Sequence, residues 1–254
     1  MTRIDEQTQT PHWVGRDDLA PGRIAIPVAL PLELRIHGRG GQGGVTCAKL
    51  IASLFANHGA FVQAFGEYGS ERTGAPVRAY VRVGREVIKN RNRVYRPDHL
   101  LVLDRGLLTE ETMEGVPEEG LVLLNTPESS GDRAACFDGL SLAMVDATAI
   151  AAAHGIGSSS RVIVNTTMVG AYCRAVGLPA RSLEEVFTAA GLSAADLDAA
   201  REAFDAVSVR KGGSRRNGRG KGLGAPWRTR RKSLPQACEF RSGQGPRPAT
   251  TSSR

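Results

Sequence analysis

Residues 38–44 read GRGGQGG, a run of five glycines interrupted by one arginine and one glutamine. Leu34–His37 before the run reads as a strand, and Val45–Asn57 after it reads as a helix. A strand that passes through a glycine turn into a helix points uncovered backbone N–H groups at one place, where the helix dipole favours negative charge. The run therefore predicts a site for a phosphate or a carboxylate, from a ligand or from a neighbouring chain. The residues of this candidate site are Gly38, Arg39, Gly40, Gly41, Gln42, Gly43 and Gly44.

Two other interpretations of the glycine run remain open. Gly38, Gly40 and Gly43 match the G-x-G-x-x-G fingerprint of dinucleotide-binding folds, and Glu67 lies 24 residues after Gly43, near where a ribose-binding acid is expected. An NAD-dependent dehydrogenase is therefore an alternative, although Glu67 falls inside a second glycine-rich loop and no second nucleotide-binding half is evident. The glycines could also serve only to pack the helix close to the sheet.

The elements that position this run alternate along the chain. Short apolar runs at residues 61–65, 100–103, 121–124 and 142–145 are separated mostly by helical or turn segments. That alternation is typical of a mostly parallel sheet covered by helices, so we expect one Rossmann-like α/β domain. Residues 77–83 instead alternate apolar and polar side chains up to Gly84-Arg85, which predicts a β-hairpin insertion that turns there and shows one cationic face.

Polar residues follow three of the apolar runs directly. Asp104, Asn125 and Asp146 each stand at the carboxyl end of an expected strand, where open α/β sheets place their sites. A catalytic role is one interpretation. The favoured one is that each side chain caps the turn or helix that comes next.

The domain boundaries follow from the ends of this pattern. Residues 1–32 contain four prolines and little periodicity, which indicates an N-terminal arm lying on another surface. Thr166–Val176 reads as a helix, Ser182 with Glu185 as a capping box, and Ser193 as the cap of a last helix. We therefore expect the α/β domain to span residues 33–208.

The remaining residues, 209–254, form a basic tail. Residues 210–254 hold thirteen of the 33 Lys and Arg but only one of the 26 acids, which leaves 20 − 25 = −5 for the rest of the chain. Such a composition predicts disorder. The tail could be a basic arm that binds an acidic subunit, ferredoxin or nucleic acid, which makes a nucleic-acid-binding module a further alternative. It could equally be the product of a shifted reading frame in GC-rich DNA.

The cysteines and the apolar segments exclude several classes of protein. Cys47, Cys136, Cys173 and Cys238 are scattered, without the clustering that a zinc site or an iron–sulfur cluster needs, so we expect no metal ligand in this chain. No apolar run approaches the roughly 20 residues of a membrane span, and the N-terminus is polar. We therefore expect a cytoplasmic protein that does not bind membranes.

Four segments carry a resemblance to a known family. GRGGQGG at 38–44, FGEYGSERTGAPVRAYVRV at 65–83, PDHLLVLD at 97–104 and NTTMVGA at 165–171 occur in this order. Together they resemble the gamma subunit of the pyruvate:ferredoxin oxidoreductases and related 2-oxoacid:acceptor oxidoreductases. The resemblance covers about 180 residues and ends just before the basic tail.

The resemblance implies one component of a thiamine-diphosphate enzyme that converts a 2-oxoacid, in the first place pyruvate, into acyl-CoA and CO2. Electrons then pass to ferredoxin. In that family thiamine diphosphate with Mg²⁺ sits between alpha and beta components, and the [4Fe-4S] clusters lie in beta and delta components. This chain is then a docking and lid domain near the place where coenzyme A enters, inactive alone and without a catalytic residue of its own.

Coenzyme A carries phosphates, so its binding surface needs amide donors and guanidinium groups within reach of one another. Beside the glycine run, the residues implied for this contact, or for a subunit interface, are Arg72, Thr73 and Arg78. Glu67 and Tyr68 are implied on a loop at the substrate side. For Arg72, a salt bridge to Glu67 or Glu71, or to another subunit, is an equal alternative, and for Arg78 a solvated face shared with Arg82 is another.

Overall fold

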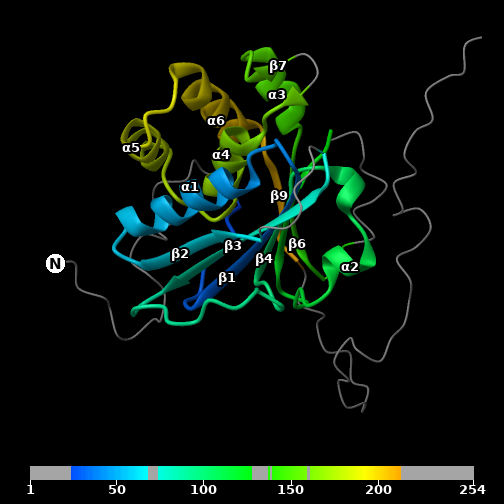
Figure 1. Cartoon of the computed structure of the whole chain (residues 1–254), viewed down its shortest axis with the longest axis vertical. Coiled ribbons are helices and arrows are strands. Elements are labelled where there is room, and N and C mark those ends of the chain that lie inside the picture. The colour runs from blue at the N-terminus through cyan, green and yellow to red at the C-terminus, as the bar shows by residue number, and fades with distance from the viewer. Residues whose placement is uncertain (1–23, 68–73, 128–136, 138, 159–160, 213–254) are drawn as a thin grey trace, which may run out of the picture.

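A seven-stranded sheet forms the centre of the molecule. The computed structural model describes residues 24–67, 74–127, 137, 139–158 and 161–212 (Figure 1). The strand order is β2-β3-β1-β4-β5-β6-β9. The bounds are β1 Leu32–Arg39, β2 Phe61–Gly66, β3 Pro76–Gly84, β4 His99–Val102, β5 Leu121–Asn125, β6 Ser141–Val145 and β9 Ser208–Arg210.

The direction of the strands confirms the expected mostly parallel sheet. The pairs β1–β4, β4–β5 and β5–β6 are parallel. β3 lies antiparallel between β1 and β2, and β9 adds an antiparallel strand outside β6. Five strands therefore run one way and two, β3 and β9, run the other way. A further short pair, β7 (Gly157–Ser158) with β8 (Arg161–Val162), stands apart from this sheet.

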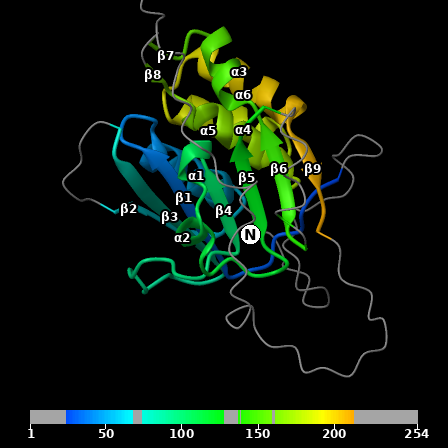
Figure 2. The ribbon, with the colours of Figure 1, turned by 90° about the vertical axis from the view of Figure 1, so that its right-hand side faces the viewer.

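The longer helices cover one face of the sheet (Figures 1 and 2). They are α1 Gly44–Asn57, α3 Ala147–Ala153, α4 Asn165–Ala175, α5 Arg181–Ala189 and α6 Ala194–Ala206. Their apolar side chains and the sheet form the main core. A smaller core on the other face includes residues around the 3-10 turn Arg105–Leu107 and the short helix α2, Glu110–Met113.

The contact of α4 with α6 depends on a glycine. A Cβ atom on Gly170 would lie 2.0 Å from the carbonyl oxygen of Ala200, closer than any real Cβ contact. The two helix backbones can touch only because Gly170 has no side chain. All residues of α4 are buried, so this contact lies at the centre of the helical layer.

The hairpin does not turn where the sequence predicted. β3 pairs with β2 and β1, so the hairpin is β2–β3, and within 85–98 the structure has no strand. Both edges of β3 are occupied, by β2 and β1, so the segment after Gly84 cannot pair with it; instead Arg82 donates to the carbonyl oxygens of Asn92 at 2.6 Å and Asn90 at 3.3 Å. These hydrogen bonds from the guanidinium group, rather than pairing with a strand, hold the segment that follows β3. The expectation that Arg82 lies on a solvated face is therefore wrong, because Arg82 is only 4% exposed.

One of the two expected caps is also wrong. Helix α5 begins at Arg181 after Ala180, without a side-chain cap. Ser182 lies inside the first turn, where its hydroxyl is 3.0 Å from Nε2 of His58 at the end of α1. Packing against α1 therefore overrides the capping pattern. The cap at Ser193 is confirmed, with a complete capping box to Asp196.

The described part of the N-terminal arm lies on the domain itself. The amide of Ile26 donates to the carbonyl of Ala175 at 2.8 Å, and Arg174 donates to the carbonyl of Ile24 at 2.9 Å. Ile26 and Val28 are buried in the main core. The sequence suggested an arm that lies on another surface. Residues 24–28 lie instead on the domain of the same chain. They pack on α4 because they supply apolar side chains to it.

Candidate functional site

The glycine turn joins β1 to α1, as the sequence predicted, and two of its backbone amides are used inside the protein. Gly40 donates to Ala75 at 2.8 Å, and Gln42 donates to Arg39 at 3.0 Å. The side chain of Gln42 accepts the amide of Arg39 at 2.7 Å. These bonds fix the shape of the turn before any ligand arrives.

The other amides of the turn are available. Gly41, with φ of 95°, and Gly43, with φ of 80°, adopt the left-handed conformation that favours glycine. Gly43 caps α1 without a side-chain hydrogen bond. Within the described part of the chain, the amides of Gly41, Gly43 and Gly44 have no acceptor. A Cβ on Gly44 would meet no described atom within 4 Å, so there is room beside the first residue of α1.

The two described arginines of the candidate site already have partners. Arg39 Nε donates to Asp104 at 2.7 Å, and Arg78 contacts Glu111 at 2.5 Å. Both arginine side chains are 37% exposed. Ion pairs at this exposure contribute roughly 0–1 kcal/mol, so a phosphate can compete with the carboxylates. Tyr68, Arg72 and Thr73 lie outside the described residues.

Glu67 does not lie where a dinucleotide fold would place it. It follows β2, which is separated from β1 by β3. Its carboxylate accepts the hydroxyl of Tyr80 at 2.6 Å and pairs with Arg93 at 2.7 Å. Burial and this hydrogen bond raise the pKa of Tyr80 to about 12, so Tyr80 stays a donor to Glu67. The geometry therefore removes the main support for a ribose-binding role of Glu67.

Two of the three polar residues at the strand ends, Asp104 and Asp146, cap the next element as favoured, whereas Asn125 does not. Asp104 accepts the amide of Gly106 at 2.8 Å, and Asp146 accepts the amide of Ala149 at 2.9 Å. Asn125 donates to the carbonyl of Leu103 at 2.8 Å. Asp104 has a second role, since it also holds Arg39 beside the glycine turn.

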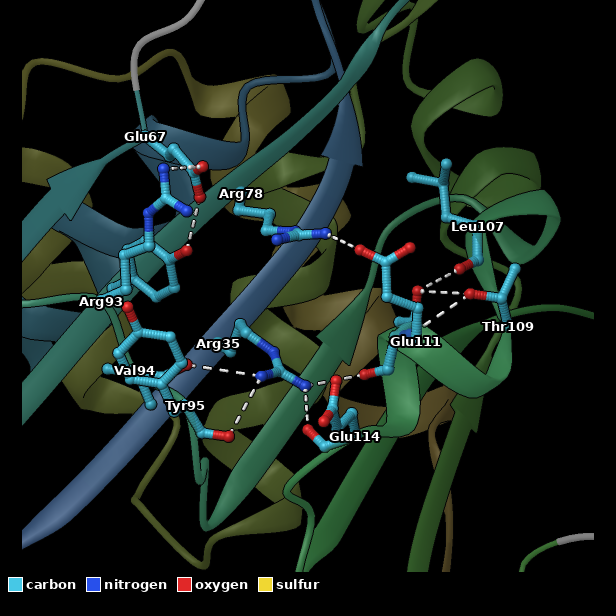
Figure 3. A network of polar contacts seen from close by, with 12 residues as sticks. Arg35, Glu67, Arg78, Arg93, Val94, Tyr95, Leu107, Thr109, Glu111 and Glu114 are labelled. Carbon is cyan, nitrogen blue, oxygen red and sulfur yellow. Dashed lines mark hydrogen bonds and ion pairs between the residues drawn. The ribbon is translucent and has the colours of Figure 1, made fainter. Parts of the chain in front are cut away.

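Sequence reasoning missed a pocket on the face of the sheet opposite α1. Here β1 and β3 place polar residues directly across from each other, with Arg35 opposite Tyr80 and His37 opposite Arg78. Figure 3 shows Arg35 between Val94–Tyr95 and the end of α2. The pocket has a volume of about 190 Å³. It is named the arginine pocket, and its lining residues are Arg35, His37, Arg78, Tyr80, Arg93, Val94, Tyr95, Glu111 and Glu114.

The signal for this pocket was present in the sequence of β1. Leu34 and Ile36 face the main core. Because successive side chains of a strand point to opposite faces, Arg35 and His37 must face the other side of the sheet. Both are nevertheless buried, at 7% and 6% exposed. Burial, with Arg35 and Arg78 nearby, lowers the pKa of His37 to about 3, so its ring is neutral at physiological pH.

The described residues were compared with the requirements of a metal site and of a membrane-spanning helix. No group of three or more His, Cys, Asp or Glu side chains among them is arranged to hold a metal ion. Cys47 and Cys173 are buried free thiols, and burial raises the pKa of Cys47 to about 12. In the described ranges no helix combines the length and the apolar character needed to cross a membrane.

Comparison with known proteins identifies the family. The sequence model of the pyruvate ferredoxin/flavodoxin oxidoreductases matches residues 33–208. Pyruvate synthase subunit PorC of Methanothermobacter marburgensis is 42% identical over 148 residues, 58% of this chain and 78% of the relative. The common gamma subunit of the pyruvate/ketoisovalerate oxidoreductases of Pyrococcus abyssi is 38% identical over 190 residues, 70% and 98% of the two chains.

A solved structure agrees with these relatives. The crystal structure of pyruvate oxidoreductase subunit PORC from Thermotoga maritima is 33% identical, with a TM-score of 0.59. The match covers 71% of this chain and 99% of that one. The resemblance that the four sequence segments indicated is confirmed, and the chain belongs to the pyruvate ferredoxin/flavodoxin oxidoreductase family.

Proposed function

We propose that this chain is the gamma component of a thiamine-diphosphate-dependent 2-oxoacid:ferredoxin oxidoreductase, with pyruvate as the 2-oxoacid. The enzyme forms acyl-CoA and CO2 and passes electrons to ferredoxin. The chain works with alpha, beta and delta components and is inactive alone. Support comes from the family match over residues 33–208 and from relatives named as PorC and gamma subunits of pyruvate oxidoreductases.

The redox cofactors belong to the other components in this proposal. A cluster needs several deprotonated thiols gathered at one place. The two described cysteines do not fit, because each is enclosed in the main core and burial raises the pKa of each thiol. Following the family resemblance, the proposal assigns thiamine diphosphate, Mg²⁺ and the [4Fe-4S] clusters to the partners, and coenzyme A is the ligand that this chain contacts.

The glycine turn carries the proposal for coenzyme A. Its available amides at Gly41, Gly43 and Gly44 stand at the start of α1, a helix of 14 residues, where negative charge is favoured. Arg39 lies beside the turn and is half exposed. This arrangement supplies the amide and guanidinium donors that a pyrophosphate or a 3′-phosphate needs. The chain then acts as a docking and lid domain at the place where coenzyme A enters.

A reconstituted enzyme tests the proposal. The full chain is combined with its alpha, beta and delta partners, and reduction of a viologen is measured with pyruvate, thiamine diphosphate and coenzyme A. Gly44→Ala adds a methyl group that meets open space within the chain but stands where the phosphate would approach. We expect the KM for coenzyme A to rise about tenfold or more, with the KM for pyruvate unchanged.

A matched control is available on the same helix. Ser53→Ala changes an exposed side chain of α1 far from the glycine turn and should leave both KM values as they are. Activity of the chain without partners would refute the assignment as an inactive component. An unchanged KM for coenzyme A in Gly44→Ala would refute the role of the glycine turn, while the family assignment would stand.

A further inference from the structure

Two residues that line the arginine pocket each have a buried nitrogen atom without a partner. Among the described residues, Nε of Arg35 and Nε2 of His37 lack a hydrogen bond although each is shielded from solvent. A buried polar atom left unpaired costs roughly 1–3 kcal/mol. Native structures rarely keep such atoms without a reason, and both of these belong to residues that line the same pocket.

Arg35 itself is held rigidly, so its free Nε–H has a fixed direction. Its Nη2 donates to the carbonyls of Glu114 at 2.6 Å and Thr112 at 2.9 Å. Its Nη1 reaches the carbonyl of Val94 at 3.4 Å. Backbone atoms rather than carboxylates bind this guanidinium, so these contacts leave its positive charge unneutralised.

The charges around the pocket favour an anion at its His37 end. The lining includes three arginines, Arg35, Arg78 and Arg93, and two acids, Glu111 and Glu114. Glu67 neutralises Arg93 from outside the lining. Two arginines lie close to His37, because Arg78 is directly across from it in β3 and Arg35 is two residues before it on the same face of β1. Tyr80 adds no negative charge to the lining, because its raised pKa of about 12 keeps it neutral at physiological pH.

Of the two carboxylates in the lining, the one that pairs with Arg78 can move away. Glu111, a residue of α2, pairs with Arg78, but its side chain is 73% exposed to solvent. Breaking such a pair costs roughly 0–1 kcal/mol, which a charge-assisted bond to a buried donor exceeds. Figure 3 shows Arg78 reaching toward Glu111 above Arg35, so the same guanidinium can turn to a ligand in the pocket.

We infer that the arginine pocket is a binding site for a small oxyanion, either the carboxylate of a small acid or inorganic phosphate. Arg35 Nε and His37 Nε2, in the tautomer protonated there, donate to it from the buried side, and Arg78 covers it. The volume of about 190 Å³ suffices, since a cavity of about 150 Å³ accepts a ligand of six heavy atoms. No residue of the glycine turn lines this pocket, and of the described residues implied for coenzyme A outside that turn Arg78 is shared with it.

Nitrogen NMR of the histidine rings tests this inference on the unmodified full chain. Phosphate, acetate and pyruvate are titrated separately at constant ionic strength set with chloride. His99 is an internal control, because burial also lowers its pKa to about 3 but it contacts Tyr172 and lies outside the pocket. We expect a saturable shift of the His37 resonances with phosphate or with both carboxylates, and no shift for His99.

Variants separate the pocket from nonspecific binding. His37→Leu removes the nitrogen and should weaken binding about tenfold, whereas His37→Gln keeps a donor and should stay close to the parent chain. Arg201→Gln, on the surface of α6, removes one positive charge elsewhere and should have no effect.

Several results would overturn the inference. These are the absence of a saturable His37 shift at millimolar concentrations of every probe, an equal shift of His99, and shifts confined to the amides of residues 38–44. Equal weakening by Arg201→Gln and His37→Leu would likewise show that only the overall charge matters.

Discussion

Gly43 and Gly44 are neighbours at the start of α1, yet alanine should change the stability of the chain in opposite directions at the two positions. Gly43 has φ of 80°, and a Cβ there would lie 2.7 Å from Nδ2 and 2.9 Å from Cγ of Asn165. A Cβ on Gly44 would meet no atom within 4 Å. Asn165 is buried and accepts the amide of Thr166 at 2.8 Å, so it cannot simply turn aside.

The magnitude follows from these two effects. A left-handed conformation costs a residue with a Cβ roughly 1–2 kcal/mol, and forcing extra atoms into a packed site costs typically about 1–3 kcal/mol. Gly43→Ala should therefore lower the free energy of unfolding by about 3 kcal/mol and Tm by about 6–12 °C for a domain of this size. Gly44→Ala should raise it by up to about 1 kcal/mol, since alanine restricts the unfolded chain.

Urea and thermal unfolding, followed by circular dichroism at the helical band, measure both changes. The double variant Gly43→Ala/Asn165→Ala should recover the part of the loss that comes from the contact but not the part that comes from φ. Equal stability of Gly43→Ala and Gly44→Ala would refute the reasoning. So would a double variant whose two effects simply add.

Three further changes in stability are expected. His37 and His99 have folded-state pKa values of about 3 against 6.5 in the unfolded chain, so the unfolded state binds protons first and stability falls with pH from about 6.5 toward 3. Urea titrations at pH 7 and pH 5 should differ by about 2 kcal/mol for each histidine. Gly170→Ala should abolish cooperative thermal unfolding, because its Cβ would overlap the carbonyl of Ala200. Ser193→Ala should lower Tm by about 2–4 °C, because α6 loses its cap, worth about 1 kcal/mol.

Each of these expectations has an outcome that contradicts it. A flat stability between pH 7 and pH 5 would mean that the two histidines are not held neutral by burial. A Gly170→Ala chain that melts like the parent would mean that α4 and α6 are not in backbone contact. An unchanged Tm for Ser193→Ala would show that the cap contributes nothing to the domain.

The main layers of the fold could be predicted from the sequence because each element carries its own local signal. The apolar period of α1 and the short apolar runs of β4, β5 and β6 are readable without knowledge of their partners. The wrong predictions for Ser182 and Arg82 involve residues whose roles depend on contacts outside their own helix or strand. Ser182 meets His58 across 124 positions, and Arg82 meets a segment that follows its strand but never pairs with it.

The two parts of the candidate site differ in the same respect, since one could be predicted from local sequence and the other could not. The glycine turn was predictable because the chemistry of bare amides lies in consecutive residues. The arginine pocket was not, because its walls come from β1, β3, residues 93–95 and α2, which meet only in the folded sheet. Arg35 and His37 were visible as an alternating pair in β1, but their burial depends on what covers that face.

The way residues 85–98 are held has a consequence for the order of folding. This stretch has no strand of its own, and its carbonyl oxygens accept hydrogen bonds from Arg82 of β3 and Arg35 of β1. Those two side chains line up on one face only after β1 and β3 have joined. We therefore expect this stretch to become ordered after the sheet has assembled, and its backbone amides to exchange with deuterium sooner than those of the strands beneath it.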